Sequence, residues 1–576
     1  MLFDARRLPG DEMIEAEICV VGGGPAGITL AREFMGQDVR VCMIESGDLE
    51  FDEQTQSLCE GATDGEPYHS LREVRRRQLG GSANLWDTRL TDNQLGFRSA
   101  PLDDIDFEQK DWLPYSGWPF GKSHLDPFYQ RAQVTGGFGP YVYDSDAWED
   151  ERARRLPPRE SLISTAIWQF GPQSTFTQGY REELRQSQNV NVFLNANVVE
   201  IETNESASQV THVRVASLDG NQFRVSARLF ILAAGGIENA RLLLLSNRFE
   251  TTGLGNRHDL VGRFFMEHPF VNCGFFIPAS REVFNSAALY DVRRVKDATV
   301  MGMLKLRDEV MRRERLLNFS LLLLPQHGRY QPEAVNSLKA LVSSALRGQV
   351  PKSAHLRNVF RNMDYVLVAT CRKITGRQTL FPNVVDGPGL CSGGGWSSLD
   401  HKSRRYSVFK AFLTTEQAPD PDNRVTLGDE RDRLGCRKGR LTWRWGDINI
   451  ESIRNAQGIL RQEVACTGLG KLRIALDDGK PHMVSPGLHH HMGTTRMHDD
   501  PRQGVVDANC QVHGVSNLFI AGSSVFPTGG YINPTLTIIA LALRLADHLK
   551  KGLKANSTVR PSQQAEDYDV TTPVRT

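Results

Sequence analysis

The sequence lacks an excess of charge of either sign. Lysine plus arginine equals aspartate plus glutamate at 68 residues each, so the formal net charge is zero. A chain without a net field has no general means of concentrating nucleic acid or an anionic membrane at its surface. No apolar run reaches the ~18 residues expected of a membrane-spanning helix. We therefore expect neither a nucleic-acid partner nor a membrane partner.

Paired cysteines are lacking as well. The nine cysteines are scattered and form no C-x-x-C pair, which disfavours a disulfide framework and a zinc ribbon. The first residues, MLFDARRLPGDEMIEAE, are polar and acidic, where a signal peptide would have a basic start and an apolar core. These features predict a cytoplasmic protein with reduced thiols.

The length of the chain favours more than one domain. It has 576 residues, whereas a typical domain has ~100 to 200 residues. The segment 91–190 shows no single period, and a basic, helical insert around 333–378 carries no motif that indicates a function. Oligomeric state is left open by these patterns.

A glycine-rich turn between a strand and a helix is the first motif that points to chemistry. A strand pattern, EICVV, runs into VGGGPAG, then into the helical pattern ITLAREFM and a second strand pattern, VRVCMI. Gly22, Gly24 and Gly27 match G-x-G-x-x-G, and Glu45 follows the second strand, where an acid that binds a ribose belongs. The glycines permit a tight turn, close approach to a pyrophosphate, and packing of helix on strand. The unit predicts a parallel sheet that binds a dinucleotide.

The carboxy-terminal segment predicts a buried helix. Pro534 suits a first helical turn, and TLTIIALALRLADHL, which begins at Thr535, is apolar nearly all round. The N-terminus of such a helix carries unpaired N–H groups and about half a positive charge. Asn533, directly before it, is a candidate for a reaction centre.

Three consecutive histidines stand in SPGLHHHMGTTRM. If this segment is a strand, its side chains alternate, so His489 and His491 point away from His490 and do not converge on one ion. No carboxylate or thiolate lies nearby in the sequence at ligand spacing, so we predict no metal site. His268, in FFMEHPF, is interpreted as a structural histidine, the commoner role for an isolated one.

The combination of GGSANLW, LAAGGIENARLLL and HHMGTTRM with VVDANCQVHGVSNLFIAGSSVFPTGGYINPTLTIIALALRLADHL resembles the glucose-methanol-choline (GMC) FAD-dependent oxidoreductases. The branch it resembles is the bacterial one related to pyranose oxidase and glycoside oxidases. The resemblance implies a mixed α/β fold with a Rossmann-like FAD-binding domain interleaved with a β-sheet-based substrate-binding domain. The implied FAD-binding domain comprises 1–90, 191–270 and 489–553, the substrate-binding domain comprises 91–190 and 271–488, and 554–576 form a disordered tail.

The same resemblance assigns residues to the flavin. The ADP part of FAD would be bound by the glycine motif and Glu45, with the backbone of Val198 at the adenine. The isoalloxazine and the pyrophosphate would be lined by Gly80, Gly81, Ser82 and Asn84. The other positions assigned to the cofactor are Gly522, Ser523, Asn533, Pro534 and Thr535. Some pyranose oxidases tether the flavin through a histidine of the GGSANLW loop, and Leu85 occupies that place here. We therefore expect non-covalent FAD.

By its position in the family motif, His490 is the expected general base, with Asn533 as the second polar group. An imidazole with an ordinary pKa near ~6.5 suits a base at neutral pH. The expected reaction is oxidation of an alcohol group of a sugar, glycoside or other polyol, with hydride transfer to flavin N5 and with oxygen or a quinone as electron acceptor. Three alternatives stay open: a quinone-dependent dehydrogenase of a non-sugar alcohol, a flavin-bound lyase of the hydroxynitrile lyase type, and a non-catalytic flavin-binding protein.

Overall fold

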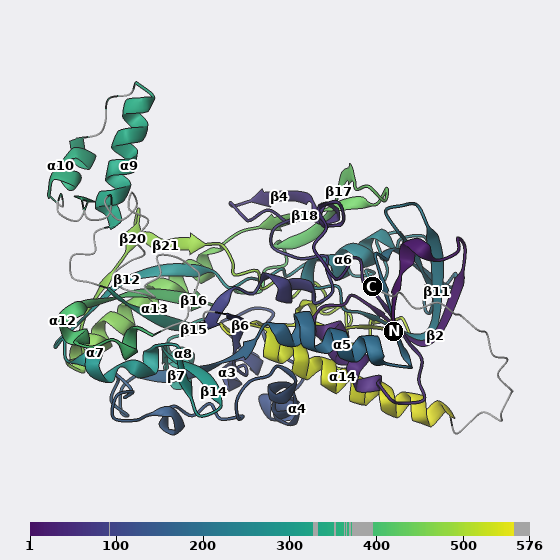
Figure 1. The fold of residues 1–576 in the computed structure, drawn as a ribbon, viewed down its shortest axis with the longest axis horizontal. Coiled ribbons are helices and arrows are strands. Elements are labelled where there is room, and N and C mark those ends of the chain that lie inside the picture. The colour runs from purple at the N-terminus through teal and green to yellow at the C-terminus, as the bar shows by residue number, and fades with distance from the viewer. Residues whose placement is uncertain are drawn as a thin grey trace.

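Two large β-sheets lie side by side along the long axis of the molecule (Figure 1). The computed structural model describes residues 1–91, 93–326, 332–348, 350, 353–361, 363, 366–367, 370 and 395–557. Among these residues, no helix is both long enough and apolar enough to cross a membrane. The mixed α/β class expected from the sequence is confirmed.

The first sheet has eight strands and contains the predicted βαβ unit. In spatial order its strands are β1 (Leu2–Asp4), β8 (Val190–Leu194), β3 (Val41–Ile44), β2 (Met13–Val21), β11 (Gln222–Leu232), β10 (Val210–Ala216) and β9 (Asn197–Thr203), and β22 (Leu518–Ile520) pairs with β11. The pairs among β1, β8, β3, β2, β11 and β22 are parallel, whereas β11, β10 and β9 pair antiparallel. Parallel pairing requires crossovers, and α1 (Pro25–Phe34) between β2 and β3 is the one the glycine motif predicts.

The second sheet has eleven strands and is antiparallel throughout. In spatial order its strands are β20 (Leu476–Asp477), β21 (Lys480–Ser485), β12 (Phe270–Pro278), β16 (Val408–Thr415), β15 (Phe319–Gln326), β14 (Ala298–Leu306), β7 (Ile163–Pro172), β6 (Gln94–Ser99) and β5 (Thr88–Thr91), with β13 (Arg293–Val295) beside β14 and β19 (Gly470–Ile474) beside β12. A smaller sheet joins β17 (Arg424–Arg431), β18 (Arg437–Trp443) and β4 (Gly61–Gly65). Segments far apart in the sequence therefore build each sheet.

Helices cover these sheets, and the longest is α14 (Thr535–Ser557), which runs along one side of the molecule (Figure 1). Besides α1, the other α-helices of the described residues are α2 (Glu53–Gln56), α3 (Asp104–Phe107), α4 (Lys122–Thr135), α5 (Tyr180–Gln186), α6 (Gly236–Leu245), α7 (Val283–Ser286), α8 (Asp308–Arg313), α9 (Pro332–Leu346), α10 (Ser353–Arg361), α12 (Lys402–Arg405) and α13 (Asp447–Cys466). As its apolar sequence predicts, α14 is buried over most of its length, and it packs against α1 and α4.

The structure changes the interpretation of the start of the tail and adds detail to that of the basic insert. The helix α14 ends at Ser557, so residues 554–557 of the expected tail are helical, while 558–576 lie outside the described residues. The basic insert contains α9 and α10, which project away from the sheets (Figure 1). Residues 371–378 of that insert also lie outside the described part of the chain.

Candidate active site

One cavity brings the glycine turn and the histidine run together. Its empty volume is about 1330 Å³, including the part open to solvent. The lining residues come from the glycine turn, the loop after it, α6, the histidine segment and the start of α14, and they include Gly22, Gly24, Glu45, Gly81, Ser82, Val198, His490, Gly522, Ser523, Pro534 and Thr535. Most of the residues that the sequence analysis assigned to the flavin therefore share one cavity.

The glycine turn is held by close backbone contacts that a side chain would prevent. A Cβ at Gly27 would lie 1.9 Å from the carbonyl oxygen of Gly22, and one at Gly22 would lie 2.6 Å from the carbonyl oxygen of Ala233. Gly24 precedes α1 and has no capping side chain. The first N–H groups of α1 are therefore unpaired donors beside the cavity, the arrangement that binds phosphate groups.

The loop that follows β4 supports the turn from the opposite side. The Gly80 N–H donates to the carbonyl oxygen of Gly23 at 2.8 Å, and Cα of Gly24 lies 2.9 Å from where a Cβ of Gly81 would be. The Asn84 amide donates to the carbonyl oxygen of Gly81 at 2.9 Å. Gly80 and Asn84 thus shape the loop that carries Gly81 and Ser82 into the cavity wall.

Glu45 lies against the same turn. Its carboxylate accepts the N–H groups of Gly23 at 2.7 Å and of Gly47 at 2.8 Å. Burial raises the pKa of Glu45, while these hydrogen bonds and the charge of Arg77 oppose the rise. A carboxylate has about four lone-pair sites, so Glu45 can still accept hydrogen bonds from the hydroxyls of a ligand.

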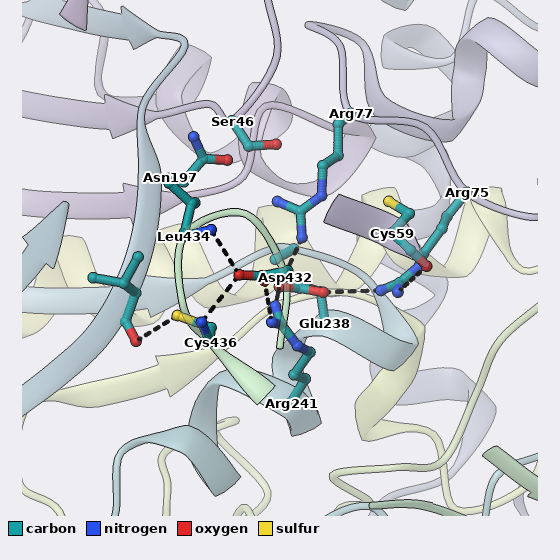
Figure 2. A network of polar contacts seen from close by, with 12 residues as sticks. Ser46, Cys59, Arg75, Arg77, Asn197, Glu238, Arg241, Asp432, Leu434 and Cys436 are labelled. Atoms are coloured by element: carbon teal, nitrogen blue, oxygen red, sulfur yellow. Dashed lines mark hydrogen bonds and ion pairs between the residues drawn. The ribbon is translucent and has the colours of Figure 1, made fainter. Parts of the chain in front are cut away.

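A network of buried charges, which the sequence analysis did not single out, is shown in Figure 2. Three of its members, Arg75, Arg77 and Glu238, line the cavity. Glu238 on α6 accepts from Arg75 at 2.9 Å, from Arg77 at 2.9 Å and from Arg241 at 2.8 Å. Arg241 also pairs at 2.5 Å with Asp432, in the turn between β17 and β18. Although burial alone would raise the pKa of Glu238, the charges of the three arginines hold it well below its usual range. The network therefore fastens three distant segments around one end of the cavity.

The histidine segment is not a strand, which corrects the geometric argument made from the sequence. The strand β21 ends at Ser485, and His489 has a left-handed backbone with φ of 64°. Strand alternation therefore does not apply, and His489, His490 and His491 all line the cavity. Tertiary contacts separate them instead, because His489 packs edge-on against His69, with ring centroids 5.1 Å apart, and His491 stands 3.6 Å from a carboxylate oxygen of Glu267.

Glu267, fully buried, holds the backbone of this segment. One of its carboxylate oxygens accepts the N–H groups of Leu488 at 3.2 Å, His490 at 2.9 Å and His268 at 3.1 Å. The other oxygen accepts the Tyr68 hydroxyl at 2.6 Å. Burial raises the pKa of Glu267 to about 7 against the effect of these donors. One side chain therefore fixes the positions of two histidines.

His490 contacts His268, the histidine interpreted from the sequence as structural. Their Nδ1 atoms are 2.9 Å apart. Burial, and after it the proximity of His268 and the charge of Arg98, hold the pKa of His490 well below its ordinary value. His490 is therefore neutral at pH 7, and one of its ring nitrogens carries a lone pair.

Asn533 directly precedes the Pro534 that lines the cavity at the start of α14. Its side-chain oxygen accepts from Nε of Arg98 at 3.3 Å, and its carbonyl oxygen accepts from the hydroxyl of Ser99 at 2.8 Å. Both partners lie on β6, so the second sheet contributes to the placement of this amide.

Two models of known protein families match the segments that form this site. The model of the FAD-dependent oxidoreductases matches residues 17–249, which hold the glycine turn and Glu45. The GMC oxidoreductase model matches residues 419–542, which hold the three histidines and Asn533. Residues 419–542 are therefore identified as a GMC oxidoreductase domain, which follows an FAD-dependent oxidoreductase domain in the same chain.

Two relatives and one solved structure are similar to larger parts of the chain. The fructose dehydrogenase large subunit of Gluconobacter japonicus is 28% identical over 366 residues, which are 62% of this chain and 54% of that protein. The chain thus spans about half the length of that relative. The 6'''-hydroxyparomomycin C oxidase of Streptomyces lividus is 22% identical over 92% of both chains. The formate oxidase of Aspergillus oryzae RIB40 shares the fold, with a TM-score of 0.51 and 16% identity over 95% of this chain and 100% of that one.

The residues that line the cavity fit FAD in the donors and acceptors that they offer. Two helix N-termini, those of α1 and α14, border one continuous space, and each favours negative charge on a ligand. Glu45 offers acceptors for ribose hydroxyls. The two glycine loops approach each other without side chains between them. Recognition of FAD as the cofactor of this family, predicted from the motifs, is confirmed.

The sequence signals that were missed are of two kinds. Arg75 to Arg77 stand as a visible triplet, RRR, next to the GGSANLW loop, so a charge run beside a glycine loop was a usable signal. The contacts of Arg98 with Asn533 and of His268 with His490 span 435 and 222 residues. No local pattern could reveal them.

Proposed function

We propose that the protein oxidises an alcohol group of a sugar, glycoside or other polyol to a carbonyl with FAD, and that His490 is the general base. The observation that carries the proposal is that His490 lines the same cavity as the dinucleotide-binding turn. The names of the relatives support the substrate class, since one is a fructose dehydrogenase and another is a 6'''-hydroxyparomomycin C oxidase.

Bound FAD would supply the acceptor for the hydride that leaves the alcohol carbon. His490 would take the hydroxyl proton, which its neutral state at pH 7 permits. The amide of Asn533 would hold the alcohol oxygen. The N-terminus of α14 adds a partial positive charge next to the cavity, which favours negative charge developing there.

The cofactor site extends over the cavity wall. We propose that FAD is held without a covalent bond by Gly22, Gly24, Gly27, Glu45, Gly80, Gly81, Ser82, Asn84, Val198, Gly522, Ser523, Asn533, Pro534 and Thr535. Leu85, at the end of the Gly81–Leu85 turn, cannot form the histidyl link. Acid precipitation tests the proposal, because all flavin absorbance should stay in the supernatant, and flavin in the pellet would contradict it.

The two large sheets are formed by different segments of the chain, which supports different binding roles for them. We propose that the eight-stranded sheet binds FAD and that the eleven-stranded sheet carries the substrate side, as the predicted domains 1–90, 191–270 and 489–553 against 91–190 and 271–488 imply. Small-molecule substrate would then meet the cofactor near Asn533, whose partners Arg98 and Ser99 lie on β6.

An anaerobic screen of flavin bleaching tests the function. The FAD-loaded protein is mixed with free sugars, glycosides, cyclitols, aminoglycosides and simple alcohols, and loss of the oxidised flavin spectrum is followed. At least one polyol should bleach the flavin, and His490→Ala should slow bleaching by roughly 10²-fold to 10⁴-fold while it keeps FAD. Bleaching by no alcohol, or unchanged rates in the variant, would overturn the oxidation or the base assignment respectively.

The acceptor is decided by a second step of the same experiment. One relative is named a dehydrogenase and another an oxidase, so an acceptor other than oxygen, such as a quinone, is the alternative to oxygen. Rapid recovery of colour in air identifies an oxidase, whereas recovery only with a quinone identifies a dehydrogenase. A substrate that is cleaved without bleaching would instead indicate a lyase.

A further inference from the structure

His268 and His490 meet through the same nitrogen of each ring. Their Nδ1 atoms are 2.9 Å apart and the rings stand at 76°. A hydrogen bond between two imidazoles requires one nitrogen with a proton and one with a lone pair. The direction of this bond therefore decides which nitrogen of His490 is free to act as a base.

The other nitrogen of His268 settles that direction. His268 Nε2 lies 3.3 Å from the carbonyl oxygen of Gly529, and a carbonyl can only accept, so Nε2 carries the proton. His268 is fully buried, and burial lowers its pKa to about 4. A neutral ring with a proton on Nε2 has its lone pair on Nδ1, so His268 accepts from His490.

The backbone geometry makes this contact a fixed feature of the fold. The same oxygen of Glu267 accepts the N–H groups of both histidines, so their main chains cannot separate without loss of a buried hydrogen bond. At Gly529, a Cβ would lie 3.3 Å from Nε2 of His268 and 2.7 Å from the methyl carbon of Met492. The ring of His268 is thereby confined between Gly529 and His490.

We propose that His268 is a positioning residue that holds His490 in the Nδ1–H tautomer and so makes Nε2 of His490 the proton acceptor. This inference rests on the proposed function, because it specifies the atom of the proposed base. In the reaction the alcohol O–H bond breaks and an N–H bond forms at Nε2 of His490. Bound FAD would accept the electron pair of the C–H bond as a hydride, and the alcohol would become a carbonyl. His490 is then a cation that still donates from Nδ1 to the lone pair of His268.

The charges around the pair favour the same state. Burial is the larger cause of the low pKa of both rings, and the charge of Arg98 lowers each further. His489 and His491 also lower the pKa of His490. The neutral pair therefore persists at pH 7, which leaves the tautomer, rather than the charge, as the property that His268 controls.

Nitrogen NMR of the FAD-loaded protein tests the tautomer directly. The protein is labelled with ¹⁵N-histidine, long-range ¹H–¹⁵N correlations are recorded, and the His490 signals are assigned by their loss in His490→Gln. We expect the shift pattern of an Nδ1–H imidazole for His490 in the unsubstituted protein. The pattern of an Nε2–H imidazole would overturn the proposal.

Two substitutions of His268 distinguish its proposed role in positioning His490 from a role in packing alone. The Gln amide in His268→Gln can accept from His490 and donate to Gly529, so this variant should keep the Nδ1–H tautomer. The phenyl ring of His268→Phe fills similar space without a lone pair, so this variant should lose the tautomer preference and should slow flavin reduction by about 10-fold to 100-fold, as loss of an outer hydrogen-bond partner does elsewhere. An unchanged tautomer of His490 in the Phe variant would contradict the role of His268. If the Phe variant does not fold, the tautomers of His490 in the Gln variant and in the unsubstituted protein decide the question.

A matched control variant and the NMR readout distinguish failure of this inference from failure of the proposed function. His513→Gln removes another histidine whose Nε2 contacts a carbonyl, that of His498 at 2.8 Å, and it should change neither tautomer nor rate. If no alcohol reduces the flavin, the proposed function fails and the tautomer is still measured. If alcohols reduce the flavin but His490 is Nε2–H, this inference alone fails.

Discussion

Nε of Arg98 lies 3.3 Å from the side-chain oxygen of Asn533, and the guanidinium carbon of Arg98 lies 4.0 Å from the centroid of the Trp168 ring. Because an arginine only donates, this contact assigns the oxygen of the amide to Arg98 and leaves the NH₂ group of Asn533 as a donor. The donor is the group that an alcohol oxygen losing its proton requires. A residue of the second sheet thus sets the orientation of a residue at the start of α14.

Substitution of Arg98 tests this orientation. Arg98→Lys keeps the charge but loses the Nε donor, and loss of a hydrogen bond to a charged group of about 1.5 kcal/mol corresponds to roughly 10-fold slower flavin reduction. Stopped-flow absorbance gives the rate, and the flavin-to-protein ratio should not change. The exposed Arg89 on neighbouring β5 provides the control Arg89→Lys, and equal rates in the two variants would remove Arg98 from the argument.

The glycine turn allows no Cβ at its third glycine. Gly27→Ala places a methyl group 1.9 Å from the carbonyl oxygen of Gly22, which forces the turn open or the helix away from the strand. We expect destabilisation of at least ~1 to 3 kcal/mol and loss of most bound FAD. Thermal unfolding and flavin content measure both effects. Gly10→Ala, where a Cβ meets nothing within 4 Å, should behave as the unsubstituted protein does.

The arginine network predicts acid sensitivity. The pKa of Glu238 is depressed in the folded state, so its stabilisation is present above the ordinary glutamate pKa and is lost as the pH falls below it. Glu238→Gln should reduce the free energy of unfolding at pH 7 by ~3 to 5 kcal/mol, because three buried arginines lose their shared carboxylate. The difference from the unsubstituted protein should shrink on acidification. Urea unfolding at several pH values measures it, with Glu430→Gln, an exposed partner of Lys438, as the control that should change little.

The raised pKa of Glu267 predicts that the protein loses stability as the pH rises, the opposite of what Glu238 predicts. Its pKa is raised from 4.5 to about 7 in the folded state, so the stability linked to its protonated form is present below pH 4.5 and is lost as the pH rises through 7, by as much as ~3 kcal/mol. Glu267→Gln cannot ionise, and its amide oxygen can accept the three backbone N–H groups. The free energy of unfolding of the unsubstituted protein should therefore decline relative to this variant between pH 5 and about pH 8. Parallel pH curves for the two proteins would show that Glu267 does not titrate in this range.

Local patterns in the sequence determined the dinucleotide-binding half of this protein. The spacing of Gly22, Gly24 and Gly27 and the apolar period of the helix after Pro534 predicted α1, α14 and their places in the fold, because backbone sterics and burial act over a few residues. The motif of the histidine run was sufficient to nominate His490, although the strand argument used to separate it from its neighbours was wrong.

Only the tertiary structure decided what surrounds those residues. His268 reaches His490 across 222 residues, and Arg98 reaches Asn533 across 435. Glu238 gathers arginines from a loop and from its own helix, and Arg241 extends the network to a turn in the small sheet. Hydrogen bonds and ion pairs depend on separations of about 3 Å in space, and a periodic pattern along one segment carries no information about which distant segment will supply the partner.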